Sequence, residues 1–285
     1  MRHFRCIFRL LYCAFRGLGP DRGVRPGAVS KTQVSPPPDL PAFFEPHYLK
    51  SIGSTNDEVK QLARGGAPEG TLVIAGEQLL GRGRSGRQWT SKPGNLYMSL
   101  LLRPQCDAGQ AAQISFLAAL ALSSAIVQIA PELEPQHKWP NDVLINGGKI
   151  AGILLESSAR LGGGVEWVVL GMGVNVAHHP DNTGQSVASL DALGATDCTA
   201  HSVLNALAPA LLRWLDIWHT EGFAPIRIAW LRRAAGIGGP LRVRLAKEEF
   251  TGTFRDLDGD GSLLVEQSDG TLRHVSAGEV FLPSI

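Results

Sequence analysis

The sequence lacks the patterns that mark several common classes of protein. Its four cysteines, Cys6, Cys13, Cys106 and Cys198, form no C-x-x-C pair, so neither a zinc site nor a disulfide framework is predicted. No apolar run is expected to reach the roughly 18 to 20 residues that cross a bilayer, and no membrane contact is predicted for the folded body. Walker, G-x-S-x-G and H-E-x-x-H motifs are also missing, which argues against the sites that they mark.

An excess of one charge is missing as well, because the 285 residues carry a net charge of only +1. The balance is uneven along the chain. Residues 1–45 hold seven basic and three acidic residues, and the remainder holds 20 basic and 23 acidic residues. A slightly acidic body is a poor non-specific binder of nucleic acid. We therefore expect any basic site in the body to be local and to suit a small anion.

The first 45 residues are predicted to be an N-terminal extension followed by a linker. Residues 1–18 alternate apolar and arginine positions at helical spacing and contain no acidic residue, as in an organelle transit peptide or a membrane-surface helix. An unstructured or mis-assigned extension is an equally good interpretation. Residues 19–41 are rich in proline and glycine, which is typical of a linker. The folded body should begin near Phe43, and a cytoplasmic location is favoured over an organelle.

The rest of the chain predicts an α+β protein with three parts, at 1–45, 46–237 and 238–285. An Asn146-Gly147 pair between two apolar runs is a hairpin signal. In the first helix, Thr55 and Glu58 have the spacing of a capping box, with Ser54 as the alternative cap. Helices are predicted at 55–64, 110–130, 199–221 and 225–235; strands are predicted at 71–77, 95–102, 143–145, 150–155, 167–170, 241–245, 250–254, 263–267 and 272–274.

The most informative stretch is residues 81–89, Gly-Arg-Gly-Arg-Ser-Gly-Arg-Gln-Trp, which we call the glycine–arginine loop. Glycine lets backbone N–H groups approach a ligand, and arginine supplies a rigid fork of donors for carboxylate or phosphate. A loop of this kind between two strands predicts an anion cradle. Taken alone, it could also be a disordered segment that binds nucleic acid.

Two further polar segments are candidates for the same site. Residues 138–142 place a lysine, a tryptophan, an asparagine and an aspartate around Pro140, and proline favours an irregular backbone there. Asp142 could ligate Mg²⁺, although a turn explains the pattern equally well. Lys149 follows two glycines and enters an apolar strand. Its ammonium is a point charge suited to a carboxylate or phosphate.

Taken together, these segments resemble the biotin–protein ligases. The resemblance rests on the glycine–arginine loop, on residues 138–142, on residues 148–156 and on residues 171–175. Ser54-Thr55-Asn56 and Glu77-Gln78 fit the same pattern, and the order of all motifs is that of the family. The likeness covers about residue 46 to the C-terminus. It implies a mixed β-sheet flanked by helices, of the class II synthetase-like type, with a small C-terminal SH3-like β-barrel.

The resemblance also implies a reaction and a set of roles. Biotin and MgATP would give biotinyl-5′-adenylate and pyrophosphate, and the acyl group would then pass to a lysine of a biotin carboxyl carrier domain of a carboxylase. Lys149 and Arg84 would be catalytic. Biotin would be bound by Ser54, Thr55, Asn56, Gln78, Arg82, Gly83, Arg84 and Lys149; the nucleotide by Arg84, Trp89, Lys138, Asn141, Asp142 and Asn175; and Mg²⁺ by Asp142.

Two departures and two rivals complete the interpretation. Leu79-Leu80 stands where the family has small residues, which predicts a stiffer start of the loop. The N-terminus shows no helix-turn-helix pattern, so no repressor role and no specific DNA binding is expected. A lipoate–protein ligase is the rival within the fold, and a nucleic-acid-binding regulator is the rival of another class. The sequence leaves the oligomeric state open, a homodimer included.

Overall fold

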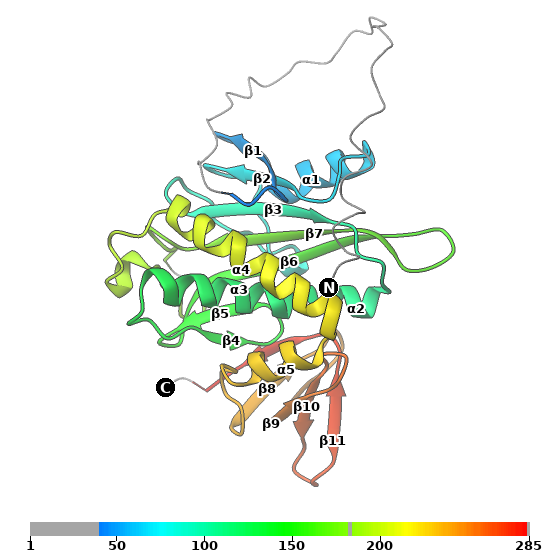
Figure 1. Ribbon diagram of the computed structural model, residues 1–285. Helices are drawn as coiled ribbons and strands as arrows, with labels where there is room; N and C mark the ends of the chain where they lie inside the picture. The colour runs from blue at the N-terminus through cyan, green and yellow to red at the C-terminus, as the bar shows by residue number, and fades with distance from the viewer. Residues whose placement is uncertain (1–39, 182–183, 284–285) are drawn as a thin grey trace, which may run out of the picture. The chain divides into compact units, whose positions relative to one another are not determined.

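The computed structural model describes residues 40–181 and 184–283, which form two sheets. The predictions for residues 1–39 lie outside this range. A seven-stranded sheet has the order β1-β2-β3-β7-β6-β5-β4, and a five-stranded antiparallel sheet has the order β11-β10-β9-β8-β12. Figure 1 shows the first sheet with its helices above the second. The predicted mixed sheet is confirmed, because β1 and β2 are parallel and the other neighbours are antiparallel.

The large sheet contains most of the predicted strands. The Asn146-Gly147 turn joins β5 to β6 with φ of 49° and 73°, the left-handed conformation that a two-residue hairpin requires. Two short strands, β1 and β4, were not predicted, because neither has the β-branched run that signals a strand. The strands are β1 (Glu45–Leu49), β2 (Thr71–Ala75), β3 (Leu96–Leu102), β4 (Gln136–Lys138), β5 (Asp142–Ile145), β6 (Gly148–Ala159) and β7 (Val165–Val174).

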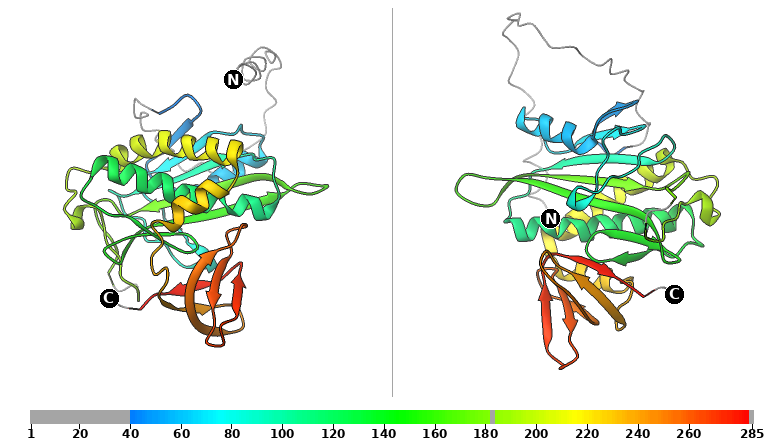
Figure 2. Two further views of the ribbon diagram at one scale, coloured as in Figure 1. Left: turned by 60° about the horizontal axis from the view of Figure 1, so that its bottom comes forward. Right: turned by 180° about the vertical axis from the view of Figure 1, so that it is seen from behind.

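Alternate residues of the central strands pack on opposite faces of this sheet. Leu72, Leu100 and Leu170 belong to the larger core cluster, and their neighbours Val73 and Leu101 belong to a smaller cluster. The smaller cluster includes Val59 and Ala63 of helix α1 (Thr55–Arg64). The larger one includes α3 (Ile114–Ile129), α4 (Ala200–Glu221) and α5 (Ala224–Leu231). Both faces are therefore covered, with α3 and α4 side by side on one of them (Figure 2).

The predicted helix at 110–130 is two helices, α2 (Ala108–Ala112) and α3, which meet at Gln113. The expectation that no apolar segment is long enough to cross a bilayer is wrong. The span Ala108–Ile129 has the length and mean hydropathy of a membrane helix, and 72% of its most apolar window is buried within the protein. A central helix packed on several sides needs apolar residues all round. The burial of this span accounts for its composition.

The C-terminal sheet is SH3-like and lies against the larger one. Trp139 donates from Nε1 to the carbonyl of Gly261 at 3.1 Å, and Arg227 donates from Nε to the carbonyl of Leu257 at 2.6 Å. Its last strand, β12, was not predicted. The strands are β8 (Pro240–Arg244), β9 (Glu249–Leu257), β10 (Leu263–Glu266), β11 (Leu272–Val275) and β12 (Glu279–Phe281).

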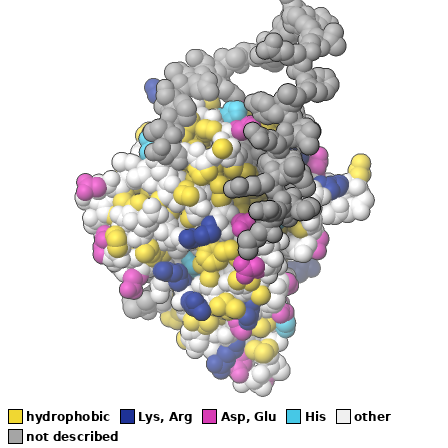
Figure 3. All heavy atoms as spheres, in the orientation of Figure 1, with side chains coloured by type: hydrophobic (Ala, Val, Ile, Leu, Met, Phe, Trp, Pro, Cys, Tyr) yellow, Lys and Arg dark blue, Asp and Glu magenta, His cyan; other side chains and the backbone are white. Residues whose placement is uncertain are grey.

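The surface carries charges of both signs. Figure 3 shows one face on which lysine and arginine side chains alternate with acidic and apolar ones. No continuous basic surface covers the described residues on this face, which agrees with the charge balance of the sequence. A polyanion would find no extended track there.

Candidate active site

The predicted site residues surround one cavity of about 1010 Å³. It lies over β6 and β7, beneath the glycine–arginine loop, and the C-terminal sheet closes one side through residues 244–246 and 277–281. Their roles stay predictions, but their convergence from distant parts of the chain is a feature of the fold. Lining residues include Ser54, Thr55, Asn56, Gln78, Arg82, Gly83, Arg84, Trp89, Lys138, Asn141, Asp142, Lys149 and Asn175.

The glycine–arginine loop is a narrow hairpin with a fixed base. Trp89 donates its backbone N–H to Gly81, and Gly83 donates to Arg87. Before the loop, the backbone N–H groups of Leu79 and Leu80 donate to Ile52 and Gly53, each at 2.8 Å. Backbone bonds of this kind do not depend on the side chains, which are 67% and 73% exposed, so the stiffer start that the two leucines predict stays a prediction.

The half of the cavity near α1, which we call the neutral half, is a hydrogen-bonded network. Thr55 donates to Oε1 of Gln78 from its backbone N–H at 2.8 Å and from its hydroxyl at 3.0 Å. The buried Ser99 hydroxyl has one proton and two acceptors, the Thr55 hydroxyl at 2.7 Å and Oδ1 of Asn56 at 2.6 Å. Ser54 is the N-cap of α1 and makes no capping bond with its side chain.

The predicted capping box at Thr55 is therefore wrong. Thr55 is the first residue inside α1, and its hydroxyl bonds Gln78 instead of the helix backbone. The tertiary contact to Gln78 replaces the local one, which the spacing of Thr55 and Glu58 could not reveal. Ser54 consequently keeps a hydroxyl that can face a ligand, and Ser54, Thr55 and Asn56 are all buried.

Glycines in β7 make room for this site. A Cβ on Gly171 would overlap the amide of Asn56, and a Cβ on Gly173 would lie 2.5 Å from Nε1 of Trp89. Real Cβ atoms cannot come so close. Gly171 and Gly173 therefore leave space for the Asn56 amide and the Trp89 indole to pack directly against the sheet.

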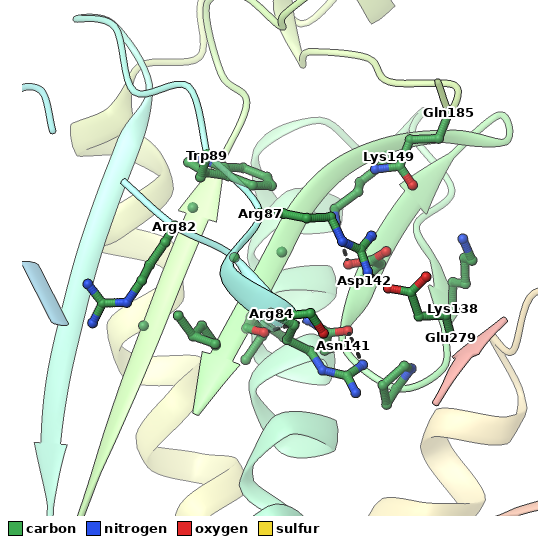
Figure 4. Close-up of a pocket in the computed structure, with 18 of the residues that line it drawn as sticks. Arg82, Arg84, Arg87, Trp89, Lys138, Asn141, Asp142, Lys149, Gln185 and Glu279 are labelled. Atoms are coloured by element: carbon green, nitrogen blue, oxygen red, sulfur yellow. Dashed lines mark hydrogen bonds and ion pairs between the residues drawn. The ribbon is translucent and has the colours of Figure 1, made fainter. Parts of the chain in front are cut away.

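Arg82 lies at the outer edge of the neutral half. Its guanidinium donates to Asp57 at 2.5 and 2.7 Å and to Glu156 at 3.1 Å, and in Figure 4 it points away from Arg84 and Arg87. The hydrogen bond from Arg82 lowers the pKa of Asp57 to about 2. Burial alone would raise the pKa of Glu156, but hydrogen bonds from Lys60 and Asn56 outweigh it and lower that pKa. Two carboxylates thus hold the arginine that the sequence assigned to biotin.

The other half of the cavity, the cationic half, centres on Lys149. Its ammonium lies 2.6 Å from Oδ1 of Asp142, and both side chains are 14% exposed. This contact is an ion pair by distance but lacks the angles of a hydrogen bond. The same ammonium lies 5.3 Å from the centroid of the Trp89 ring, within cation–π range. The Trp89 Nε1–H is buried and has no acceptor among the described residues.

Three further cations line this half (Figure 4). Among the described residues, Arg84 donates to two neutral oxygens and to no carboxylate: Oδ1 of Asn141 at 3.2 Å and the carbonyl of Gly278 at 3.3 Å. Burial lowers the pKa of Arg84 and of Lys138. Arg87 pairs with Glu279, and among the described residues no carboxylate lies within ion-pair distance of Lys138. Half-buried cations without full compensation indicate a site for an anion.

Two asparagines orient the groups around them. Asn141 donates to the carbonyl of Ile153 at 2.6 Å and so presents its oxygen to Arg84. Asn175 uses its amide N–H groups on the carbonyls of Ala188 at 3.0 Å and Lys149 at 3.4 Å. The Asn175 oxygen lacks a donor in the described part of the chain, and the residue lines the cavity. It is an acceptor placed to meet a ligand N–H.

The residues that sequence reasoning missed are Asp57, Ser91, Ser99, Glu156 and Glu279. The first four contact a predicted site residue, and Glu279 pairs with Arg87 of the glycine–arginine loop. Glu156 meets Arg82 from 74 residues away, and Ser99 meets Asn56 from 43 residues away. No local pattern carries such a pairing, so only the fold could reveal it. The segment 138–142 was predicted to be irregular and forms the turn of a β4–β5 hairpin.

The arrangement fits a magnesium ion only in company with phosphates. Among the described residues no three histidine, cysteine, aspartate or glutamate side chains form a metal-binding group. Asp142 is the carboxylate beside Lys149, and Mg²⁺ commonly takes one or two protein carboxylates and completes its shell with phosphate oxygens and water. A single protein ligand at Asp142 is compatible with that chemistry.

These features define an α+β protein whose cavity joins a neutral hydrogen-bonding half to a cationic half. The profile of the biotin/lipoate A/B protein ligase family matches residues 83–232, and that of the biotin protein ligase C terminal domain matches residues 236–282. The chain therefore belongs to the biotin/lipoate A/B protein ligase family.

Individual relatives are similar over most of the described chain. The biotin–[acetyl-CoA-carboxylase] ligase of Paracoccus denitrificans is 45% identical over 239 residues, which are 82% of this chain and 98% of that protein. The bifunctional ligase/repressor BirA of Bacillus subtilis is 36% identical over 81% of this chain and 72% of its own length. The biotin protein ligase of Aquifex aeolicus, solved with biotin and ATP, superimposes with a TM-score of 0.72 at 26% identity and covers 83% of this chain and 97% of that one.

Proposed function

We propose that this cavity joins the carboxylate of biotin to the adenylyl group of ATP and then passes the biotinyl group to a lysine of a biotin carboxyl carrier domain. The chain is a biotin–protein ligase with biotin and ATP as substrates, as its family and its similarity to named biotin ligases indicate. The division of labour among its residues, the carrier and the magnesium ion belong to our proposal.

The observation that carries the proposal is the pairing of the two halves of the cavity. A ureido head group offers N–H donors and a carbonyl acceptor. The neutral half offers the Thr55 and Ser54 hydroxyl oxygens as acceptors, and the Gln78 amide as a donor. Lys149 then lies where a carboxylate and an α-phosphate would meet. Cations fixed in advance stabilise the charge that develops in the transition state without the cost of reorganisation.

The nucleotide is assigned to the cationic half. Arg84, Lys138 and Lys149 would hold the phosphates, and the Asn175 oxygen would accept from the adenine amino group. Trp89 offers an indole face over the same space. Mg²⁺ would neutralise the polyphosphate beside Asp142. The glycine–arginine loop would keep water from the mixed anhydride, which is prone to hydrolysis.

The network of the neutral half also favours biotin over lipoate. A dithiolane ring offers no strong hydrogen-bonding group, so the polar groups around Thr55 and Gln78 would lose contact with water without gaining a partner. Unpaired buried polar groups are costly, and sites built to bond them reject analogues that lack the partner. Lipoate is therefore our second candidate. We place the activity in the cytoplasm as a further proposal, in line with the two described cysteines, Cys106 and Cys198, which are both free.

A single assay tests the proposal. Purified protein with biotin, MgATP and an apo carrier domain should release pyrophosphate and add one biotinyl group to one carrier lysine, as intact-mass and peptide mass spectrometry would detect. Replacement of biotin by lipoate should abolish the product. Transfer of lipoate but not biotin would contradict the assignment, as would nanomolar binding of duplex DNA without any turnover.

A further inference from the structure

Ser91 lies just beyond the glycine–arginine loop, outside every sequence motif that predicted the site. It is 7% exposed, and its carbonyl accepts from the backbone N–H of Gln78 at 3.2 Å. Gln78 and Ser91 thus form an isolated antiparallel β-bridge, with the glycine–arginine loop between them in the chain. The Ser91 side chain faces Gln78, to which the proposed function assigns recognition of biotin.

Hydrogen-bond polarity leaves the Ser91 hydroxyl one arrangement that satisfies both of its partners. The carbonyl of Trp89 can only accept, so the Ser91 hydroxyl donates to it, at 3.0 Å. The Ser91 oxygen then accepts, and it does so from Nε2 of Gln78 at 3.0 Å. A serine hydroxyl has a single proton. Because that proton is committed to Trp89, the amide nitrogen of Gln78 must face Ser91.

The opposite end of the Gln78 amide agrees with this orientation. The backbone N–H of Thr55 can only donate, and it meets Oε1 at 2.8 Å. Both ends therefore require Oε1 toward α1 and Nε2 toward Ser91. An amide nitrogen carries two hydrogens, and Ser91 takes one of them. The second is left for a ligand in the cavity that Gln78 lines.

We propose that Ser91 is a positioning residue that fixes the Gln78 amide as a hydrogen-bond donor to the carbonyl of the bound head group. This inference deepens the proposed function and rests on it, because the acceptor is taken to be the ureido oxygen of biotin. The bond from Ser91 to Trp89 adds a consequence. A chain of hydrogen bonds from Gln78 through Ser91 to the carbonyl of Trp89 therefore connects the head-group site with the last residue of the glycine–arginine loop.

The primary experiment measures biotin binding without ATP by isothermal titration calorimetry. Ser91→Ala should weaken binding about fivefold, the range expected when a neutral hydrogen bond loses its support. A thioxo analogue, in which sulfur replaces the ureido oxygen, is the matched probe because sulfur is a weaker acceptor. The wild-type protein should prefer the oxygen compound, and Ser91→Ala should reduce that preference.

The controls separate positioning from a general loss of stability. Ser123→Ala removes another buried hydroxyl, bonded to His137 at 2.8 Å and outside the cavity lining, and should leave biotin affinity unchanged. In a Gln78→Ala background, Ser91→Ala should have no further effect on binding. An equal loss for the oxygen and sulfur compounds, or a full loss in the Gln78→Ala background, would overturn the proposal. If the wild-type protein bound neither compound, the proposed function itself would fail.

Discussion

In the neutral half of the cavity, Thr55, Asn56, Gln78 and Ser99 all have hydrogen-bond partners within the protein. In the cationic half, the four cations Lys149, Arg84, Arg87 and Lys138 line the wall with two carboxylates, Asp142 and Glu279. The first half is held in place before a ligand arrives, and it can select by the direction of the donors and acceptors that remain for the ligand. The second lacks negative charge, which ATP would supply. Selectivity for biotin and activation of its carboxylate are thereby assigned to different sets of interactions.

Lys149→Ala is the strongest way to break the cationic half without touching the neutral one. The ammonium would no longer stabilise charge developing on the α-phosphoryl group, so we expect the rate of adenylate formation to fall about 10²- to 10³-fold, as when a single stabilising donor is lost elsewhere. Pyrophosphate exchange measures this step. Biotin affinity should change far less.

Two controls accompany this variant. Lys92→Ala removes an exposed lysine outside the cavity lining and should be silent. Lys149→Ala leaves Asp142 without its cation, so the double variant Lys149→Ala/Asp142→Asn restores the charge balance and should be equally inactive. Near-normal pyrophosphate exchange by either Lys149 variant would remove Lys149 from the mechanism, and circular dichroism would establish that the fold is intact.

The contrast also explains what the sequence could predict. Lys149, Arg84 and Gln78 stand in compact motifs, and long apolar runs such as Leu96–Leu102 identify their strands without help from the rest of the chain. The partners of these residues are different. Asp57 and Glu156 meet Arg82 only because α1 and β6 are adjacent in the fold, and Ser99 is one serine within an apolar strand. Chemistry-bearing motifs are local, whereas the contacts that orient them are set by topology.

The second prediction concerns the pH dependence of stability and the buried His137, which lies beside the cationic half. His137 precedes Lys138 in β4, is fully buried, and lies against Ser123 at 2.8 Å and the carbonyl of Trp230 at 3.3 Å. Burial lowers its pKa from 6.5 to about 4. Between pH 6.5 and pH 4, this histidine is protonated in the unfolded chain but neutral in the folded protein. Stability from this residue is therefore complete above pH 6.5 and falls as the pH approaches 4, by about 3 kcal/mol.

Urea unfolding at a series of pH values between 7 and 4 measures this loss. His137→Gln should flatten the profile by about the same amount, because glutamine does not titrate. His219→Gln, at an exposed position of α4, is the matched control and should leave the profile unchanged. An unaltered slope in His137→Gln would show that the buried imidazole is not the group that titrates.

The smallest expected effect is the one that compares the two halves most directly. Salt screens charges, and the Debye length falls from about 10 Å at 0.1 M to about 3 Å at 1 M. Contacts between the triphosphate and Arg84, Lys138 or Lys149 should weaken accordingly, so the KM for ATP should rise about threefold over this range. Biotin affinity, which depends on neutral hydrogen bonds at the head group, should stay nearly constant when titrated without ATP. Potassium chloride and potassium glutamate should act alike if screening is the cause. An equal loss of affinity for biotin and ATP would mean that the two halves do not differ in the way their polar groups indicate, and that salt acts on the loop shared by both.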